Sequence, residues 1–200
     1  DTDGDGYSNL GDPFPNDKTQ WSDQDGDRYG DNASGTRADD CPSAYGDSRK
    51  NGTFGCPDAD GDGWADSQDA FDADSSQWND SDGDGYGDEF SGFQGDGCKN
   101  TAGNSTIDRY GCVDTDGDGY SDFGDAFDNN PTQWIDSDGD GYGNNQSTNA
   151  TQSDAFPSDG TQWNDTDGDG HGDNKYGTQG DHFPNNPNRW QDTDEDGYAN

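Results

Sequence analysis

The sequence predicts an irregular, elongated tandem-repeat array with little regular secondary structure. Three observations predict it. A cluster of the form Asp-x-Asp-x-Asp recurs eight times in 200 residues, the segments beside the clusters are rich in Gly, Asp, Asn and Ser, and aliphatic core formers are nearly absent. Leu10, Ile107, Val113 and Ile135 are the whole supply of Leu, Ile and Val. Recurrence at intervals of about 20–50 residues is the signature of repeat proteins, whose units contact mainly their neighbours.

The composition limits how such a chain can fold. Asp and Glu number 46 against nine Lys and Arg, the formal net charge is -37, and only 22% of residues are hydrophobic. Such a chain normally stays disordered, because it cannot bury enough apolar surface to offset the entropy of ordering. A solvated acidic tail is therefore the simplest alternative. Acidic tails carry blocks of like charge, whereas these carboxylates keep a fixed spacing, so we expect a fold that depends on bound cations.

The clusters divide the chain into short and long units. They begin at Asp1, Asp23, Asp58, Asp80, Asp114, Asp136, Asp165 and Asp192. Their starts are separated by 22, 35, 22, 34, 22, 29 and 27 residues, so short and long units alternate through the first six. We expect residues 1–200 to form one continuous repeat array. Because the sequence starts at the first residue of one cluster and stops at the ninth of another, we also expect it to be an excerpt of a longer chain.

Each cluster has the ligand spacing of a calcium site. Three carboxylates on alternate residues, turned inward by glycine, form a cage of hard oxygen ligands that suits Ca²⁺. In the short units a side chain at the ninth position and an Asp at the twelfth follow, which are ligand positions of the EF-hand loop; there the seventh residue contributes its backbone carbonyl. No helix-forming segments flank the cages. The net charge is compatible with one to two Ca²⁺ ions in each cage.

The predicted calcium ligands keep one register throughout. In the short units they are Asp1, Asp3, Asp5, Tyr7, Asn9 and Asp12; Asp58, Asp60, Asp62, Trp64, Asp66 and Asp69; and Asp114, Asp116, Asp118, Tyr120, Asp122 and Asp125. In the long units they are Asp23, Asp25, Asp27, Tyr29, Asp31 and Asp39; Asp80, Asp82, Asp84, Tyr86, Asp88 and Asp96; Asp136, Asp138, Asp140, Tyr142, Asn144 and Asp154; and Asp165, Asp167, Asp169, His171, Asp173 and Asp181. The last Asp of a long unit follows a polar insertion, which is tolerable because loop-closure entropy rises slowly with length.

The final cage and two glycine positions depart from this register. The final cage, Asp192, Asp194, Asp196 and Tyr198, lacks its downstream Asp. Arg28 stands where the sixth-position Gly of the second cage belongs, which calls the turn of that cage into question, and Glu195 replaces the fourth-position Gly of the final cage.

The junctions between cages follow a second pattern. Two residues after the last Asp of each unit stands Phe or Cys; each Phe is followed seven residues later by Trp, and each such Cys by a second Cys. The Phe–Trp pairs are Phe14 and Trp21, Phe71 and Trp78, Phe127 and Trp134, Phe156 and Trp163, and Phe183 and Trp190. We expect these pairs and disulfides to be interchangeable clasps between cages. Cys41–Cys56 with Cys98–Cys112 is one of three possible connectivities, and a zinc site is the weaker alternative.

These residues resemble a known family. Asp39-Asp40-Cys41-Pro42, running to Cys56-Pro57-Asp58, resembles the thrombospondin type 3 repeat of prokaryotic surface arrays, and the segments Asp69–Trp78 and Asp154–Trp163 are similar to its cysteine-free units. The resemblance implies an extracellular array in which calcium and disulfides replace a hydrophobic core. It also implies that a second ion can share a cage. Candidate ligands for that ion are Asp17, Asp74 and Asp159, with Asn130 and Asn186 in equivalent places; a turn-forming role is the alternative for all five.

Seven Asn-x-Ser/Thr sequons are candidates for N-linked glycans. Five lie in insertions, where a bulky sugar can project without touching a cage: Asn32, Asn51, Asn104, Asn145 and Asn149. Asn79 and Asn164 immediately precede a cage and are poorer candidates.

The sequence favours a structural role over catalysis. His171 and His182 occupy repeat positions, and a carboxylate saturated by Ca²⁺ cannot shuttle protons, so we expect no enzyme. So acidic a chain is a poor partner for nucleic acid, and no segment resembles a membrane span. We expect an extracellular or cell-surface fibre, stalk or coat, with Ca²⁺, N-linked glycans and further copies of the array as partners. The alternatives are an adhesin stalk presenting a separate domain and a calcium-storing or mineral-associated protein.

Overall fold

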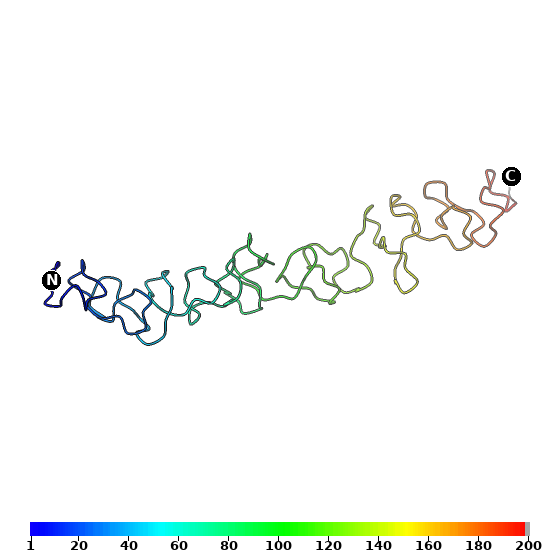
Figure 1. The fold of residues 1–200 in the computed structure, drawn as a ribbon. Helices are drawn as coiled ribbons and strands as arrows, with labels where there is room; N and C mark the ends of the chain where they lie inside the picture. The colour runs from blue at the N-terminus through cyan, green and yellow to red at the C-terminus, as the bar shows by residue number, and fades with distance from the viewer. Residues whose placement is uncertain (199–200) are drawn as a thin grey trace. The chain divides into compact units, whose positions relative to one another are not determined.

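The computed structural model describes residues 1–198, and within them the backbone is irregular. It contains turns and bends but no helix and no named strand (Figure 1). Two isolated parallel bridges, Gly30 with Ala38 and Gly143 with Ser153, are the only β-pairings in these residues. The prediction of an irregular fold is therefore confirmed. The chain divides into two compact units, Asp1–Asn100 and Thr101–Asn200, which are described here each by itself.

The Asp-x-Asp-x-Asp segments fold because each Asp caps the backbone that follows it. In the third cage, Asp58 Oδ1 accepts the N–H of Gly61 (2.9 Å) and its Oδ2 accepts the N–H of Gly63 (2.8 Å). Gly61 and Gly63 have φ of +80° and +103°, in the left-handed region that glycine adopts without steric cost. The backbone therefore curls around the first carboxylate, and the alternate Asp side chains gather inside the curl.

The ninth residue closes each complete cage. Asp66 donates its backbone N–H to the carbonyl of Pro57 (2.8 Å), and its Oδ1 accepts the N–H of Ala59 (2.7 Å). Asn144 makes the equivalent pair of bonds with Ile135 and Ser137. Since Asp and Asn both serve, this closure needs a side-chain oxygen rather than a charge.

The interior of the protein is polar. Among the described residues, the buried hydrophobic ones are Cys56, Ala65 and Cys112. The largest fully buried side chains are instead four glutamines, Gln20, Gln77, Gln133 and Gln162. Each stands directly before a Trp and directly precedes a long unit. These glutamines were not among the residues predicted to hold the fold.

Each buried glutamine organises the insertion of the long unit that follows. Gln77 Oε1 accepts the N–H of Glu89 (3.0 Å), while its Nε2 donates to the carbonyls of Glu89 (2.9 Å) and Phe93 (3.3 Å). A Cβ atom on Gly87, the eighth residue of the Asp80 cage, would overlap with Gln77. Gln20, Gln133 and Gln162 have equivalent partners, with Gly30, Gly143 and Gly172 beside them. The polar insertions are thus folded around an amide.

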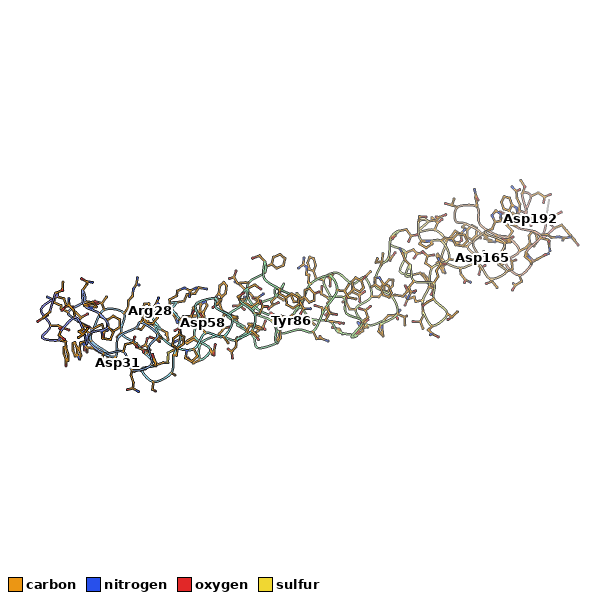
Figure 2. All side chains as sticks on the ribbon, in the orientation of Figure 1. Arg28, Asp31, Asp58, Tyr86, Asp165 and Asp192 are labelled. Carbon is orange, nitrogen blue, oxygen red and sulfur yellow. A yellow bond between two sulfur atoms is a disulfide. The ribbon has the colours of Figure 1, made fainter. Side chains whose placement is uncertain are left out.

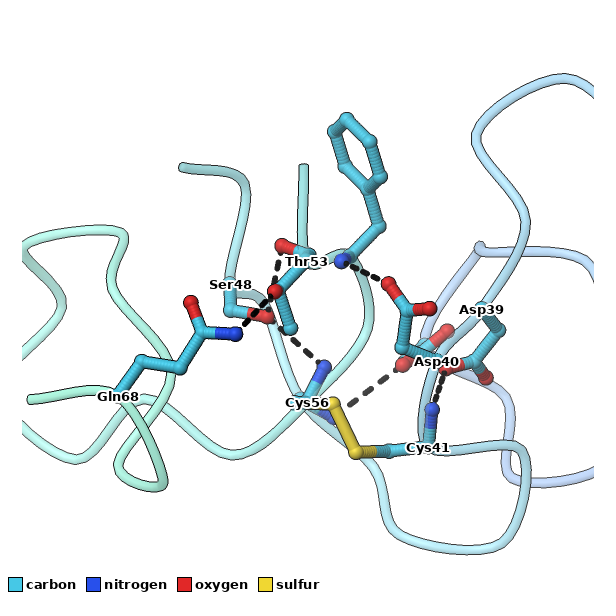
Figure 3. The surroundings of a disulfide bond; sticks show 10 residues. Asp39, Asp40, Cys41, Ser48, Thr53, Cys56 and Gln68 are labelled. Atoms are coloured by element: carbon cyan, nitrogen blue, oxygen red, sulfur yellow. Dashed lines mark hydrogen bonds between the residues drawn. A yellow bond between two sulfur atoms is a disulfide. The ribbon is translucent and has the colours of Figure 1, made fainter. Parts of the chain in front are cut away.

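Where a short unit follows, a disulfide takes the place of the segment that carries the buried glutamine. Cys41 is bonded to Cys56 with a Cα–Cα distance of 5.0 Å, and Cys98 is bonded to Cys112, so the predicted connectivity is confirmed. Beside the first bridge, Ser48 Oγ accepts the N–H of Cys56 (3.0 Å) and donates to the carbonyl of Thr53 (3.3 Å) (Figure 3). The bridge is therefore set in a local hydrogen-bond network rather than in an apolar core.

The predicted pairing of Phe rings with Trp rings is wrong. Across residues 1–198 the Trp rings stack on the seventh residue of the preceding cage: Tyr7 on Trp21, Trp64 on Trp78, Tyr120 on Trp134, Tyr142 on Trp163 and His171 on Trp190, with centroids 4.0–6.3 Å apart. The ends of the Phe–Trp segment do meet through the backbone, where Ala70 N–H donates to the carbonyl of Trp78 (3.2 Å). Phe71 begins a tight turn, with its carbonyl accepting the N–H of Asp74 (2.8 Å), and lines a cavity instead.

Candidate metal centres

The structure brings the three carboxylates of each cluster together. In the Asp1, Asp23, Asp58, Asp80 and Asp114 cages, and in three further groups, one oxygen from each Asp lies within 4.8 Å of the others. Asp58, Asp165 and Asp192, which open three of the cages, are labelled in Figure 2. Alternate spacing is what allows this convergence, because the turn carries every second side chain to the inside.

The last Asp of each long unit reaches its cage across the insertion. Asp96 is 3% exposed, and its Oδ1 accepts the N–H of Cys98 (2.6 Å). Burial raises the pKa of Asp96, and the carboxylates of Asp84, Asp82 and Asp88 raise it further. The predicted ligand at the end of the insertion therefore lies beside the carboxylates at its start. Asp39, Asp154 and Asp181 have equivalent surroundings.

The pKa of Asp39 shows that an ionised carboxylate is unfavourable in its cage when no cation is bound. Burial raises the pKa of its carboxyl from 3.8 to about 6; the N–H of Cys41 opposes the shift, while the carboxylates of Asp27, Asp25 and Asp31 add to it. A proton or a bound cation would relieve this cost, because either one reduces the charge on the buried carboxylate.

Seventeen buried carboxylate oxygens in residues 1–198 have no hydrogen-bond partner. Each belongs to a predicted cage ligand at the first, third, fifth or last position: Oδ2 of Asp3, Asp5, Asp25, Asp39, Asp60, Asp96, Asp116, Asp118, Asp140, Asp154, Asp167 and Asp181, both oxygens of Asp82 and Asp138, and Oδ1 of Asp192. Buried polar atoms are nearly always paired, and an unpaired buried carboxylate is costly. Several such oxygens converging on one space fit a hard divalent cation such as Ca²⁺.

The ninth residues, like the first residues of the cages, are already held by protein donors. Asp88 Oδ1 accepts the N–H of Ser81 (2.9 Å), and its Oδ2 accepts Ser81 Oγ (2.6 Å) and Asn79 Nδ2 (2.5 Å). Burial acts to raise the pKa of Asp88, but the bonds from Ser81 and Asn79 outweigh it and the pKa is lowered. The ninth residue closes the loop; its role as a ligand stays a prediction, as does that of the seventh-position carbonyl.

The departures from the glycine pattern do not break the turns. Arg28 adopts φ of +80°, and its N–H donates to Asp23 Oδ2 (3.1 Å) as glycine does in other cages. Glu195 adopts φ of +56°. Figure 2 labels Arg28 together with Asp31 of the same cage. The Asp23 cage is therefore formed, at the steric cost of a left-handed non-glycine residue.

A cationic side chain lies beside the Asp58 cage. Lys50 Nζ lies 3.4 Å from Asp62 Oδ2, and it lies 5.0 Å and 5.9 Å from the ring centroids of Trp78 and Trp64. Asp62 is the fifth residue of the Asp58 cage, and the matching oxygens of Asp5, Asp118 and Asp140 have no hydrogen-bond partner. The ammonium group of Lys50 would therefore compete with a metal ion predicted at this position.

The candidates for a second ion are held in turns. Asp17 Oδ1 accepts both the N–H (3.0 Å) and the hydroxyl (2.6 Å) of Thr19, and the hydroxyl bond is the main reason that its pKa is lowered. Asp74 and Asp159 bind Ser76 and Thr161 in the same way. Asn130 makes the same bonds with Thr132 without a charge, which favours the turn-forming alternative. A second ion at these residues stays a prediction.

The sequons differ in the freedom of their amide nitrogens. Asn104 and Asn149 are exposed, and among the described residues neither side chain has a hydrogen bond. Asn51 is also exposed, but its Nδ2 donates to Gln68 Oε1 (3.3 Å). Asn32 and Asn145 donate Nδ2 to the carbonyls of Thr19 (2.8 Å) and Thr132 (2.9 Å). Asn79 and Asn164 donate Nδ2 to the ninth Asp of the adjacent cage. Glycosylation of all seven stays a prediction.

The two histidines have structural contacts. The His171 ring stacks on Trp190 with centroids 4.0 Å apart, in the place of the usual aromatic residue. His182 donates its backbone N–H to the carbonyl of Trp190 (2.9 Å).

A recurring sequence pattern marks the four buried glutamines, although they were not predicted from it. A Gln stands directly before Trp21, Trp78, Trp134 and Trp163, and the cage that follows each has Gly at its eighth position, whereas complete short cages have Ser or Ala there. A residue that recurs in register and faces a small partner indicates close packing.

The sequence matches no model of a known protein family, and a search of well-characterised proteins gives no match either. In residues 1–198, no helix has the length and apolar character needed to cross a membrane.

Proposed function

We propose that this chain is an extracellular, calcium-binding structural repeat protein that forms part of a fibre, stalk or surface coat. The observation that carries the proposal is the set of seventeen buried carboxylate oxygens without partners, all in cage register. Calcium would supply the attraction that a hydrophobic core supplies elsewhere. The thrombospondin type 3 repeat, which the sequence resembles, is the family that this proposal fits.

Two further features support a structural role. The buried glutamines and the disulfides hold the segments between cages, so much of the sequence outside the cages serves to fix their spacing. Two disulfides are also consistent with an oxidising environment such as the cell exterior. A protein selected only for calcium capacity would have no need of clasps in a fixed register.

Imaging of the native assembly tests the proposal. We expect electron microscopy of the native cell surface or secreted material to show a filament, rod or coat containing this repeat, which loses its regular form in EGTA. Filaments and rods capped by a separate domain would distinguish a fibre from an adhesin stalk. Detection of the protein only as dispersed chains, with or without Ca²⁺, would contradict a structural role.

A further inference from the structure

A cavity beside the Asp80 cage lies in the first unit. Its volume is about 710 Å³, and it lies between the turn that begins at Phe71 and the insertion of the Asp80 unit. The residues that give it its character are Phe71, Asp72, Asp74, Gln77, Tyr86 and Phe93. Tyr86 is labelled in Figure 2. A concave, largely aromatic space of this size with a few polar groups is typical of sites for small ligands.

This cavity differs from its counterparts in the aromatic residue at the tip of the insertion. In all four long units the residue at the insertion tip donates its N–H to a Ser or Thr hydroxyl next to the buried Gln. Three of these tips are Thr36, Thr151 and Thr178, whereas the fourth is Phe93. The Phe93 side chain is 69% exposed. An aromatic ring that replaces threonine, and stays largely exposed beside another Phe, suggests a binding surface.

The charge of the lining favours a cationic ligand. The lining includes the carboxylates of Asp72 and Asp74 and no Lys, Arg or His. The whole chain, before any cation binds, has a formal net charge of -37, and an acidic chain attracts cations and repels anions. Aromatic faces attract organic ammonium groups through the ring quadrupole, and such rings bind quaternary ammonium ligands. A hydrated metal ion gains no comparable attraction from the rings.

We propose that the Phe71–Tyr86–Phe93 cavity binds an organic ammonium cation of the choline type. The cavity adjoins the Asp80 cage, since Tyr86 is the seventh residue of that cage, but the cage carboxylates of Asp80, Asp82 and Asp84 do not line it. It goes beyond the structural function proposed above.

The preceding long unit provides an internal comparison. An equivalent cavity there is lined by Phe14, Tyr29 and Tyr45 and by the carboxylates of Asp17, Asp27 and Asp47. It differs in that Arg28 and Arg37 stand in place of Gly85 and Gln94, and Thr36 in place of Phe93. Two guanidinium groups would repel an ammonium ligand, so this cavity is not expected to bind one. Arg37 and Gln94 share φ of +48°, so Arg is compatible with the backbone at position 94.

The test is an NMR titration of the whole chain, loaded with Ca²⁺, with choline. We expect saturable shifts of the amides of Gly87 and Gln94, and weakening of the affinity by about tenfold in Gln94→Arg and in Phe93→Thr. Both substitutions copy a residue that the chain already uses at the equivalent position, so they preserve the fold. The uncharged isostere 3,3-dimethylbutan-1-ol is the ligand control and should bind at least about tenfold more weakly.

Three results would overturn the proposal: no saturable shift with choline, equal affinity for the alcohol, or affinity unchanged in both variants.

A second experiment distinguishes two sources of the same cation. Binding of wild type, but not of Gln94→Arg, to phosphatidylcholine vesicles supports a lipid headgroup as the ligand. Binding of choline without binding to vesicles supports a free cation.

Discussion

Replacing a buried glutamine with an apolar residue of similar length is expected to unfold one insertion. In Gln77→Met, the N–H of Glu89 and the carbonyl of Phe93 lose their partner, and the carbonyl of Glu89 loses one of two donors. Leaving a buried polar group unpaired costs about 1–3 kcal/mol, and the added apolar burial returns about 1 kcal/mol. We expect a net local destabilisation of about 2–4 kcal/mol.

Amide hydrogen exchange measures this loss where it occurs. In saturating Ca²⁺, exchange of the Gly92 and Asp96 amides should accelerate by about thirtyfold to a thousandfold, since each 1.4 kcal/mol is a factor of ten. Amides in the distant Asp1 cage should keep their rates, because repeat units couple mainly to neighbours.

A matched control distinguishes the loss of a buried side-chain amide from the loss of an exposed one. Gln68 is exposed, and its Nε2 donates to Thr53 Oγ1 (2.8 Å), as Figure 3 shows. Gln68→Met should change stability by less than about 0.5 kcal/mol. Unchanged exchange in Gln77→Met, or an equal effect of Gln68→Met, would refute the role assigned to the buried glutamines.

Three further predictions concern single cages. Arg28→Gly removes a left-handed arginine and should stabilise its cage by about 1 kcal/mol against urea; a loss of stability would contradict the strain. Lys50→Met removes the ammonium beside the Asp58 cage, so calorimetry should find tighter Ca²⁺ binding there by about two- to fivefold, with unchanged affinity at other cages. Folding raises the pKa of Asp39 from 3.8 to about 6, so protonation stabilises the ion-free fold at acid pH and this stabilisation is lost as pH rises through about 6. Protons and Ca²⁺ therefore compete, and Ca²⁺ affinity should fall between pH 7.5 and pH 5.5; a pH-independent affinity would contradict this.

The positions of the carboxylates could be predicted because ligand spacing is local. Alternate Asp residues with glycine between them define a turn within six residues, and the structure forms it even where Arg28 replaces glycine. The disulfide Cys41–Cys56 was likewise predictable, because its register relative to the cages matches that of the Phe–Trp segments.

The contacts between segments could not be predicted from spacing alone. The Trp78 ring packs on Trp64 rather than on Phe71. A backbone hydrogen bond joins the two ends of the Phe–Trp segment, so the segment closes without a contact between the two rings. Gln77 was overlooked because a buried amide is uncommon, and its value depends on backbone groups twelve and sixteen residues away. Sequence patterns predict which carboxylates lie together more readily than they predict the contacts that hold these carboxylates in place.

Calcium removal tests the central claim most directly. Small-angle scattering of the purified, disulfide-intact chain should show a compact, ordered array in excess Ca²⁺ and a marked expansion in EGTA, because the buried carboxylates then repel one another. Mg²⁺ should restore the form poorly, since it requires closer octahedral ligands. Scattering that is identical with and without Ca²⁺ would contradict the account.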